Sequence, residues 1–400
     1  MFDAGGYLYE FDYLNHTNSL RILFYSLIIF TIVILLCFKA RLSLHVSILI
    51  ASLKSIIFFT YFFFFYNSDY HFYDDIVYFT VTRDKLLSYG ILDYVNNIDN
   101  IKSLIGTNHI GFWSLVFLSF KIFGTYYYSV VLVNIILTSF ASYFFYLTFL
   151  KLNFRHIFCQ LFFAFSLIHW DVISWSTFLI SKEPLIYFLL SFLFYNLVTL
   201  YAERTIKLKN LILIILCLLL ISELRTYVFI FVTIISSAYI MFLVKIPNRI
   251  FLKSVVFSLP VIILFTFSYL NYSFIYQSLA GAFALLEPNM AQINQIPFNM
   301  LKTLLTPLPM NIQPNYGFLF LTSIFHFIFI AIVPFGLFLS FNKTHKGLMP
   351  YLVFFISILV FYSFFQELAG PRQRFQYSMV LMYWQFLPIF KLFISNKITN

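Results

Sequence analysis

Charged residues are scarce in this chain of 400 residues. Asp, Glu, Lys and Arg together make up 10% of it, whereas 62% of its residues are hydrophobic. A soluble domain of this length could not bury so much apolar surface. The apolar residues also gather in repeated runs of the length that crosses the hydrocarbon core of a bilayer. The composition therefore excludes an ordinary soluble protein and predicts an integral membrane protein.

Cysteine is rare as well. Cys37, Cys159 and Cys217 all fall inside apolar runs, so the sequence predicts neither a disulfide framework nor a thiolate metal site. The histidines lack the spacing of zinc ligands, and no Walker loop, glycine-rich dinucleotide turn or serine nucleophile elbow occurs. Trp occurs 4 times against 57 Phe, so we interpret the aromatic excess as AT-rich codon usage rather than a sugar-binding platform.

The net charge of +10 does not indicate a nucleic-acid partner. The basic residues lie in short clusters at the ends of apolar runs, which is the pattern that membrane topology produces. The first twenty residues contain Asp3, Glu10 and Asp12 and no basic segment. We therefore expect no cleavable signal peptide and a first apolar run that stays in the protein.

Twelve apolar runs are candidate membrane helices: about 22–38, 46–66, 110–124, 128–150, 157–170, 184–201, 210–223, 227–244, 254–270, 317–340, 348–365 and 377–394. Many of their connections are short and basic, and such loops stay in the cytoplasm. The basic residues concerned are Lys39, Arg41, Lys151, Arg155, Arg204, Lys207, Lys209, Lys245, Arg249, Lys253, Lys343, Lys346, Lys391 and Lys397. All of these loops can be cytoplasmic only if one run does not cross.

The run at 110–124 is the one that we expect not to cross. It is short, it carries Lys121, and its crossing would move every later basic loop outside. We therefore interpret His109–Gly124 as a helix along the outer membrane surface. With this assignment 14 of the 25 Lys and Arg residues lie inside, and 14 of the 15 acidic residues lie outside, Glu203 being the exception.

The predicted fold is an all-α, polytopic bundle of about 11 spans in the inner (plasma) membrane, with the N-terminus outside and the C-terminus cytoplasmic. Residues 1–400 form one integral membrane domain. Its outer loops are 67–127, with two surface helices, and 271–316, which is rich in proline. The short runs 157–170 and 210–223 predict tilted or broken helices.

Asp74 and Asp75 are the first candidate functional residues, because they follow the second run directly. Two adjacent carboxylates at the outer surface could act as a general base or bind a divalent cation. The stretch Asp75–Gly90 has the pattern of an amphipathic surface helix. The alternative is structural: an aspartate that caps this helix and pairs with its dipole.

Three further groups lie at outer ends of apolar runs. Lys182 could neutralise a phosphate, or could pair with Glu183 and cap the next helix. Arg225 suits phosphate oxygens, with an internal salt bridge to Glu223 or Glu183 as the alternative. Arg372 and Arg374 could reach a diphosphate, or could anchor the chain to anionic lipid headgroups.

The order of these features resembles the GT-C class of multispanning glycosyltransferases, which includes protein O-mannosyltransferases and lipid A aminoarabinose transferases. Asp74 and Asp75 are similar to that class's acidic pair in the first outer loop. His109–Gly124 is similar to its second surface helix, which ends in a Phe-Gly turn. Glu183 is similar to an acid at the start of a later span, and Arg372–Phe375 is similar to its late Arg-x-Arg-aromatic stretch. The chain departs from the class in having an additional first crossing and Asp-Asp in place of Asp-Glu.

The resemblance implies an enzyme that transfers a sugar or glycan from a polyprenyl-phosphate or -diphosphate carrier to a glycan or lipid acceptor at the outer surface. Asp74 or Asp75 would accept the acceptor's proton, and Arg225, Arg372 and Arg374 would offset charge on the departing phosphate. Two alternatives remain open. An O-antigen or capsule polymerase would also use outer arginines, and a flippase or transporter would use deep charges such as Lys54.

Overall fold

The computed structural model describes residues 19–66, 73–105, 110–204, 207–242, 295–306, 308–312, 317, 319–341, 346–363 and 371–394. Every element in this part of the chain is helical, which confirms the all-α class. The elements are α1 (Ser19–Lys39), α2 (Leu44–Thr60), η2 (Tyr61–Phe65), α3 (Tyr73–Val81), η3 (Thr82–Leu86), α4 (Ile91–Asn96), α5 (Ile98–Ile105), α6 (Ile110–Phe123), α7 (Tyr127–Lys151), α8 (His156–Ile168), α9 (Trp170–Thr177), α10 (Glu183–Glu203), α11 (Leu208–Ser222), α12 (Thr226–Phe242), α15 (Ile296–Leu305), η5 (Pro309–Asn311), α16 (Phe320–Ile330), α17 (Val333–Phe341), η7 (Lys346–Leu348), α18 (Met349–Ser363), α19 (Pro371–Gln376) and α20 (Ser378–Ile394).

Several of these helices are long and apolar enough to span a membrane. Five satisfy both criteria alone: α1, α2 with η2, α7, α10, and η7 with α18. Two bent pairs satisfy them together, α8 with α9 at 44° and α16 with α17 at 50°. The break between α8 and α9 falls at His169, within the run predicted to be tilted or broken. The predicted run 254–270 lies outside the described residues.

Short connections from distant parts of the chain meet at one end of the bundle, which we name the Lys207 end. Glu203 in the last turn of α10 forms ion pairs with Lys151 at the end of α7 (2.8 Å) and with Lys207 before α11 (2.7 Å). Gln160 of α8 donates to the carbonyl of Ala40, just after α1, at 3.2 Å. The basic connections that the sequence groups together are therefore close in space.

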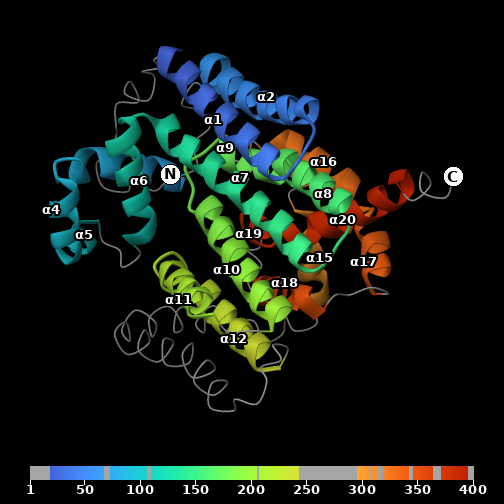
Figure 1. Cartoon of the computed structure of the whole chain (residues 1–400). Coiled ribbons are helices and arrows are strands. Elements are labelled where there is room, and N and C mark those ends of the chain that lie inside the picture. Colours follow the sequence, from blue (N-terminus) through green and yellow to red (C-terminus); the bar gives the residue numbers. More distant parts are fainter. Residues whose placement is uncertain are drawn as a thin grey trace.

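The opposite ends of the same helices form the Glu183 end. Tyr25 in the second turn of α1 donates to the carbonyl of Phe123, and the amide of Ile180 donates to the hydroxyl of Tyr127 at the start of α7 (3.2 Å). Figure 1 shows α1, α7 and α10 running side by side through the bundle. Successive long helices thus alternate in direction between the two ends.

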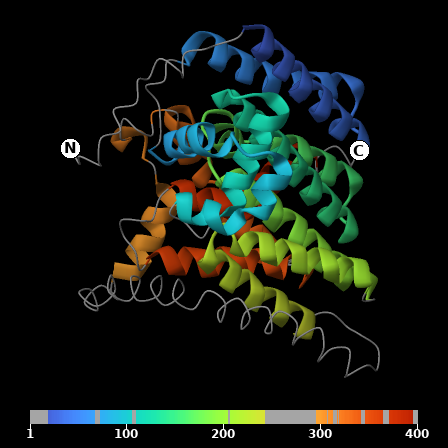
Figure 2. The ribbon, with the colours of Figure 1, turned by 90° about the vertical axis from the view of Figure 1, so that its left-hand side faces the viewer.

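Helices α3 to α6 form a lobe at the Glu183 end. Its small core consists of Leu86, Tyr94, Ile101, Ile110, Trp113 and Phe117. The chain is helical from Tyr73 to Leu86, close to the predicted amphipathic helix. Figure 2, viewed from the left side of Figure 1, shows this lobe in front of the bundle.

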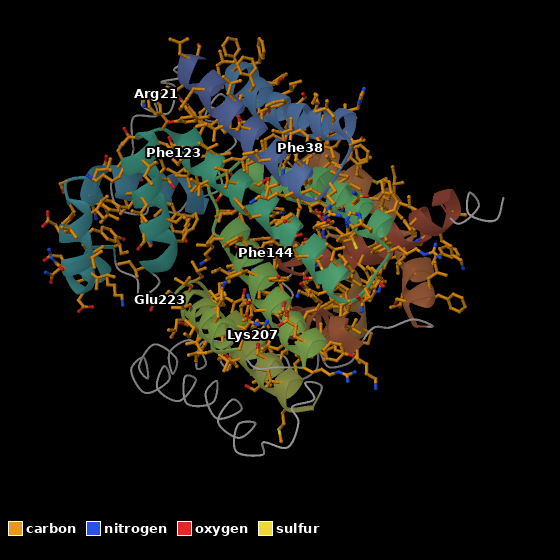
Figure 3. The ribbon with its side chains drawn as sticks, in the orientation of Figure 1. Arg21, Phe38, Phe123, Phe144, Lys207 and Glu223 are labelled. Atoms are coloured by element: carbon orange, nitrogen blue, oxygen red, sulfur yellow. The ribbon has the colours of Figure 1, made fainter. Side chains whose placement is uncertain are left out.

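Both ends of α6 lie at the Glu183 end. A Cβ atom added to Gly111, in its first turn, would lie 3.2 Å from the Cβ of Glu223, and one added to Gly124, just after it, would lie 2.5 Å from a guanidinium nitrogen of Arg21. Gly124 also has a φ of +94°, which favours glycine. Arg21, Phe123 and Glu223 lie toward the same side in Figure 3. Helix α6 therefore lies across the end of the bundle and does not run along its length.

Candidate functional site

Glu183 is the meeting point of two arginines from distant segments. It begins α10, with Pro184 in the first helical turn, where proline is favoured, and it is fully buried. Its Oε1 atom accepts a hydrogen bond from Arg372 Nε of α19 at 2.6 Å and another from Arg225 Nη2. We refer to Arg225 and Arg372 as the arginine pair.

Arg225 reaches Glu183 from the three-residue connection between α11 and α12. Its guanidinium also donates to the hydroxyl of Tyr227, which in turn contacts the hydroxyl of Tyr362 at the end of α18. Burial acts to lower the pKa of Arg225, but Tyr227 and the carboxylate of Glu183 raise that pKa well above its ordinary value. The group therefore stays charged in this site.

Several buried polar atoms near this ion pair have no hydrogen-bond partner among the described residues. They are Ser181 Oγ, Glu183 Oε2, Glu223 Oε2, Arg225 Nε and Thr226 Oγ1. A buried polar atom without a partner costs free energy, so most such atoms in folded proteins bind protein, water or a ligand. The two hydroxyls and Arg225 Nε can donate to an anionic group, whereas the two carboxylate oxygens can only accept and suit a donor such as a hydroxyl.

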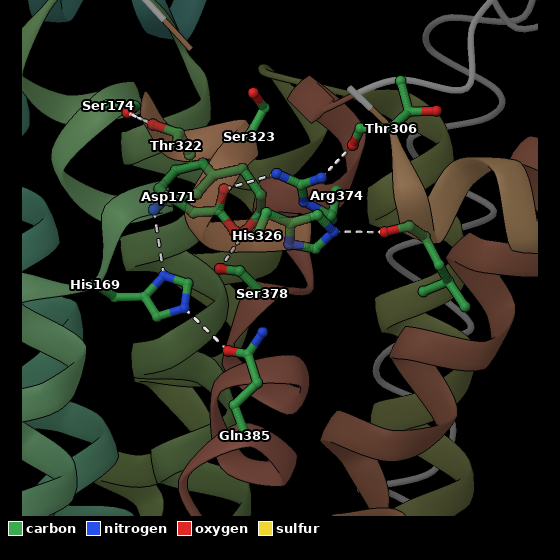
Figure 4. A network of polar contacts seen from close by, with 12 residues as sticks. His169, Asp171, Ser174, Thr306, Thr322, Ser323, His326, Arg374, Ser378 and Gln385 are labelled. Carbon is green, nitrogen blue, oxygen red and sulfur yellow. Dashed lines mark hydrogen bonds and ion pairs between the residues drawn. The ribbon is translucent and has the colours of Figure 1, made fainter. Parts of the chain in front are cut away.

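Arg374 lies in a separate cluster, shown in Figure 4. Its side chain is fully buried, its Nη2 donates to Asp171 Oδ1 of α9 at 2.8 Å, and its Nη1 donates to the carbonyl of Thr306 after α15. A buried charge is tolerated when it is paired and hydrogen-bonded in this way. Arg374 therefore anchors the short helix α19 that carries Arg372.

Two histidines extend this cluster. His169 Nδ1 accepts from the amide of Asp171 at 3.3 Å, so its Nε2 is the atom that donates to Gln385 Oε1 of α20, at 3.1 Å. His326 Nε2 of α16 lies 2.6 Å from the carbonyl of Leu304 of α15 and donates to it. These contacts link α9, α15, α16, α19 and α20, and Figure 4 shows the side chains that make them.

Asp75 occupies a buried position between the lobe and the bundle. Its Oδ1 accepts from the amide of Ile76 at 2.9 Å, and its Oδ2 accepts from the hydroxyl of Tyr127. The same hydroxyl accepts from the amide of Ile180, three residues before Glu183. Asp75 is thus one side chain away from the segment that leads into α10.

An apolar cavity of about 730 Å³ lies near the cluster of polar contacts around Arg374. Residues of α15, α17, α18 and α20 line it, among them Leu304, Leu305, Tyr351 and Trp384. Leu305 directly precedes Thr306, the residue whose carbonyl binds Arg374. The cavity therefore begins close to the polar cluster and has the apolar lining that suits a hydrocarbon chain.

The structure brings together part of the predicted site. Glu183, Arg225 and Arg372 meet, and Lys182 directly precedes Glu183. For Arg225 the internal salt bridge to Glu183, the alternative considered from the sequence, is present. Arg374 pairs with Asp171 and does not reach Glu183's oxygens in the described contacts.

Other predictions lie partly outside the described residues. His109, a predicted substrate- or phosphate-binding residue, is among them, as are residues 271–294 of the second outer loop. The side chain of Asp74 is not described although its backbone belongs to α3. In the described part of the chain, no group of three or more His, Cys, Asp and Glu side chains could hold a metal ion. All three cysteines are buried and unpaired with one another.

Tyr127 and His326 are among the residues of this region that were not singled out from the sequence. Tyr127 is one of 29 tyrosines and stands in an ordinary Tyr-Tyr-Tyr run, so nothing in the pattern distinguishes it. His326 lies inside an apolar run, and a histidine at membrane depth is the one signal that could have indicated a buried polar contact.

No family model, curated protein or solved structure matches this chain.

Proposed function

We propose that this protein is a membrane glycosyltransferase that moves a sugar or glycan from a polyprenyl-(di)phosphate carrier to an acceptor on the non-cytoplasmic side, in surface polysaccharide or glycolipid assembly. The observation that carries the proposal is the convergence of the arginine pair on Glu183 at the end of the bundle. Two guanidinium groups that share one carboxylate oxygen place two positive charges together, and Arg225 Nε has no hydrogen-bond partner among the described residues.

In the proposed reaction, the acceptor hydroxyl oxygen attacks the anomeric carbon and the bond from that carbon to the phosphate oxygen breaks. Asp74 accepts the proton of the hydroxyl, and the arginine pair offsets the negative charge that develops on the departing phosphate. Direct displacement inverts the configuration at the anomeric carbon. Glu183 keeps the two guanidinium groups adjacent before the carrier binds, so little reorganisation is needed.

The apolar cavity supports a lipid-linked donor. It lies between helices of the bundle and borders the cluster that anchors α19. A carrier whose phosphate binds the arginine pair would have space for its hydrocarbon chain among α15, α17, α18 and α20, where burial of apolar surface adds about 25 cal/mol per Å². The cavity and the polar contacts of Arg374 meet at the neighbouring residues Leu305 and Thr306.

The proposed topology has about 11 spans, with the Lys207 end in the cytoplasm and the Glu183 end outside. Two observations support it. The connections after α1, α7 and α10, which are expected to be cytoplasmic, lie at one end, and α6 lies across the other. Tyr239 near the end of α12 donates to Gly347 before α18 at 3.3 Å, whereas α15 lies at the Glu183 end, where Asn299 binds the carbonyl of Ser363. The proposed topology assigns the crossing between these two positions to the run predicted at 254–270, which lies outside the described residues.

Single cysteines introduced into a variant without Cys37, Cys159 and Cys217 test this topology. Asn96→Cys in the lobe is expected to react with a membrane-impermeant maleimide on intact cells, and Asn153→Cys at the Lys207 end only after permeabilisation. The two positions are separated by α6 and α7, so labelling of both from the same side would mean that α6 also crosses and would refute the assignment. Labelling of Asn153→Cys alone on intact cells would mean that the protein has the opposite orientation in the membrane.

Binding of undecaprenyl phosphate to the full chain in lipid nanodiscs tests the function. The protein is expected to bind it in preference to undecaprenol, and Arg372→Gln is expected to weaken binding at least about tenfold, since hydrogen bonds between charged groups contribute about 1.5–3 kcal/mol. Arg204→Gln, at the exposed Lys207 end, serves as the matched control. Equal binding of the alcohol and the phosphate, or native affinity in Arg372→Gln, would exclude the proposed phosphate site.

A repeat-unit polymerase of O-antigen or capsule is the second candidate, because the arginine pair suits a lipid-linked glycan diphosphate equally well. The glycolipids of cells with and without the gene separate the two: a transferase yields a single addition, and a polymerase yields a ladder of repeat units.

A flippase for lipid-linked glycans would rest on Lys54, which is buried in α2 and donates to Ser139 of α7 at 3.2 Å. Movement of the carrier without bond formation in reconstituted vesicles would favour it.

A further inference from the structure

We propose that Asp75 is a positioning residue that acts through Tyr127 on the segment before α10, and so holds Glu183 at the arginine pair. The inference rests on the phosphate site proposed above. It gives the two adjacent aspartates different tasks: Asp74 accepts the proton, and Asp75 fixes geometry.

A short chain of contacts connects Asp75 to this segment. Tyr127 donates its hydroxyl hydrogen to Asp75 Oδ2 and accepts the amide hydrogen of Ile180 at 3.2 Å. Because the hydroxyl both donates and accepts, its two neighbours fix its hydrogen position. The second oxygen of Asp75 accepts from the amide of Ile76, which ties the carboxylate to its own helix α3. The lobe and the α9–α10 connection are thus joined through one tyrosine.

The contact at Ile180 bears directly on Glu183. Ile180 is fully buried, and a buried amide needs an acceptor, which Tyr127 supplies. Only Ser181 and Lys182 separate this amide from Glu183 at the start of α10. A change in the orientation of the connection would therefore move the carboxylate that the two arginines share.

The surroundings of Asp75 suit a fixed contact better than proton transfer. The carboxylate is fully buried, and the rings of Phe62, Tyr66 and Phe79 lie around Tyr127, with centroid distances of 6.4, 5.2 and 6.0 Å. A general base must come within hydrogen-bond reach of the acceptor's proton, directly or through one water. A hydrogen bond to a carboxylate is strong in such an apolar environment, which favours a durable positioning contact.

Tyr127→Phe and Asp75→Asn in the full chain, reconstituted in nanodiscs, test the inference. Hydrogen exchange of the amides at 178–183 is expected to become at least about tenfold faster in Tyr127→Phe, which removes the acceptor for Ile180, and to change in the same direction in Asp75→Asn. Affinity for undecaprenyl phosphate is expected to fall about tenfold in both. The double variant should be no weaker than Tyr127→Phe, because the two side chains act as one unit.

Tyr146→Phe is the matched control, because it removes a tyrosine hydroxyl from the same helix at the Lys207 end, where that hydroxyl contacts His156. It should leave exchange at 178–183 and phosphate affinity unchanged. Native exchange in both test variants would overturn the inference, and so would faster exchange with native affinity, since the contact would then not position the arginine pair. If the unmodified protein did not prefer the phosphate over undecaprenol, the proposed function would fail, and exchange at Ile180 would still decide whether Asp75 orders this segment.

Discussion

Glu183→Gln is expected to lose about 3–5 kcal/mol of folding stability and its affinity for undecaprenyl phosphate, the largest effect of any single change at the arginine pair. The substitution removes the charge that Arg225 and Arg372 share, and leaves two guanidinium groups, whose side chains are 11% and 15% exposed, close together without it. Their repulsion should separate α19 from the α11–α12 turn. The change in stability is measured by heating the protein in detergent and recording the loss of its monodisperse peak.

Glu203→Gln is the matched control for this prediction. Glu203 also bridges two cations, Lys151 and Lys207, but these side chains are 37% and 62% exposed, and the glutamate itself is 25% exposed. Water screens such pairs, so each contributes at most about 1 kcal/mol. If Glu183→Gln were no more destabilising than Glu203→Gln, the buried ion pairs would not hold this end of the bundle together.

Much of the helical framework could be predicted because crossing a bilayer demands long apolar runs. Each predicted run in the described part of the chain coincides with a helix or a bent helix pair. The break near His169 follows from the shortness of the run at 157–170. For 110–124 the charge of the later loops predicts a helix that does not cross. The structure has helix α6 there with both ends at the Glu183 end, and its place relative to a membrane stays a prediction.

The pairing of charges could be predicted only in part. The sequence placed Glu183, Arg225 and Arg372 at outer ends of runs, because buried charges need partners. It left open whether Arg225 meets Glu183 or a ligand, since contacts between residues far apart in sequence depend on helix packing. Arg372 binds Glu183, whereas Arg374 binds Asp171. This difference arises from the helical conformation of α19, which the residues Arg-Gln-Arg do not indicate by themselves.

Arg374→Met is expected to destabilise the fold by about 3–5 kcal/mol, because it leaves the carboxylate of Asp171 buried without its cation. Asp171→Leu should have a similar effect for the converse reason. The double variant Asp171→Leu/Arg374→Met should be more stable than either single variant, since apolar side chains of similar volume can replace a buried ion pair at little cost.

The double-mutant cycle isolates the interaction from the other effects of each substitution. Arg83→Met and Asp84→Leu form the control cycle, since this ion pair at 2.6 Å is partly exposed and should show coupling below about 1 kcal/mol. Strictly additive effects at Asp171 and Arg374 would mean that the pair does not stabilise the fold.

The double variant Asp171→Leu/Arg374→Met also distinguishes whether Arg374 anchors α19 or binds the phosphate. If Arg374 only anchors α19, a stable double variant should keep affinity for undecaprenyl phosphate, whereas a loss of affinity with stability restored would make Arg374 a ligand of the phosphate.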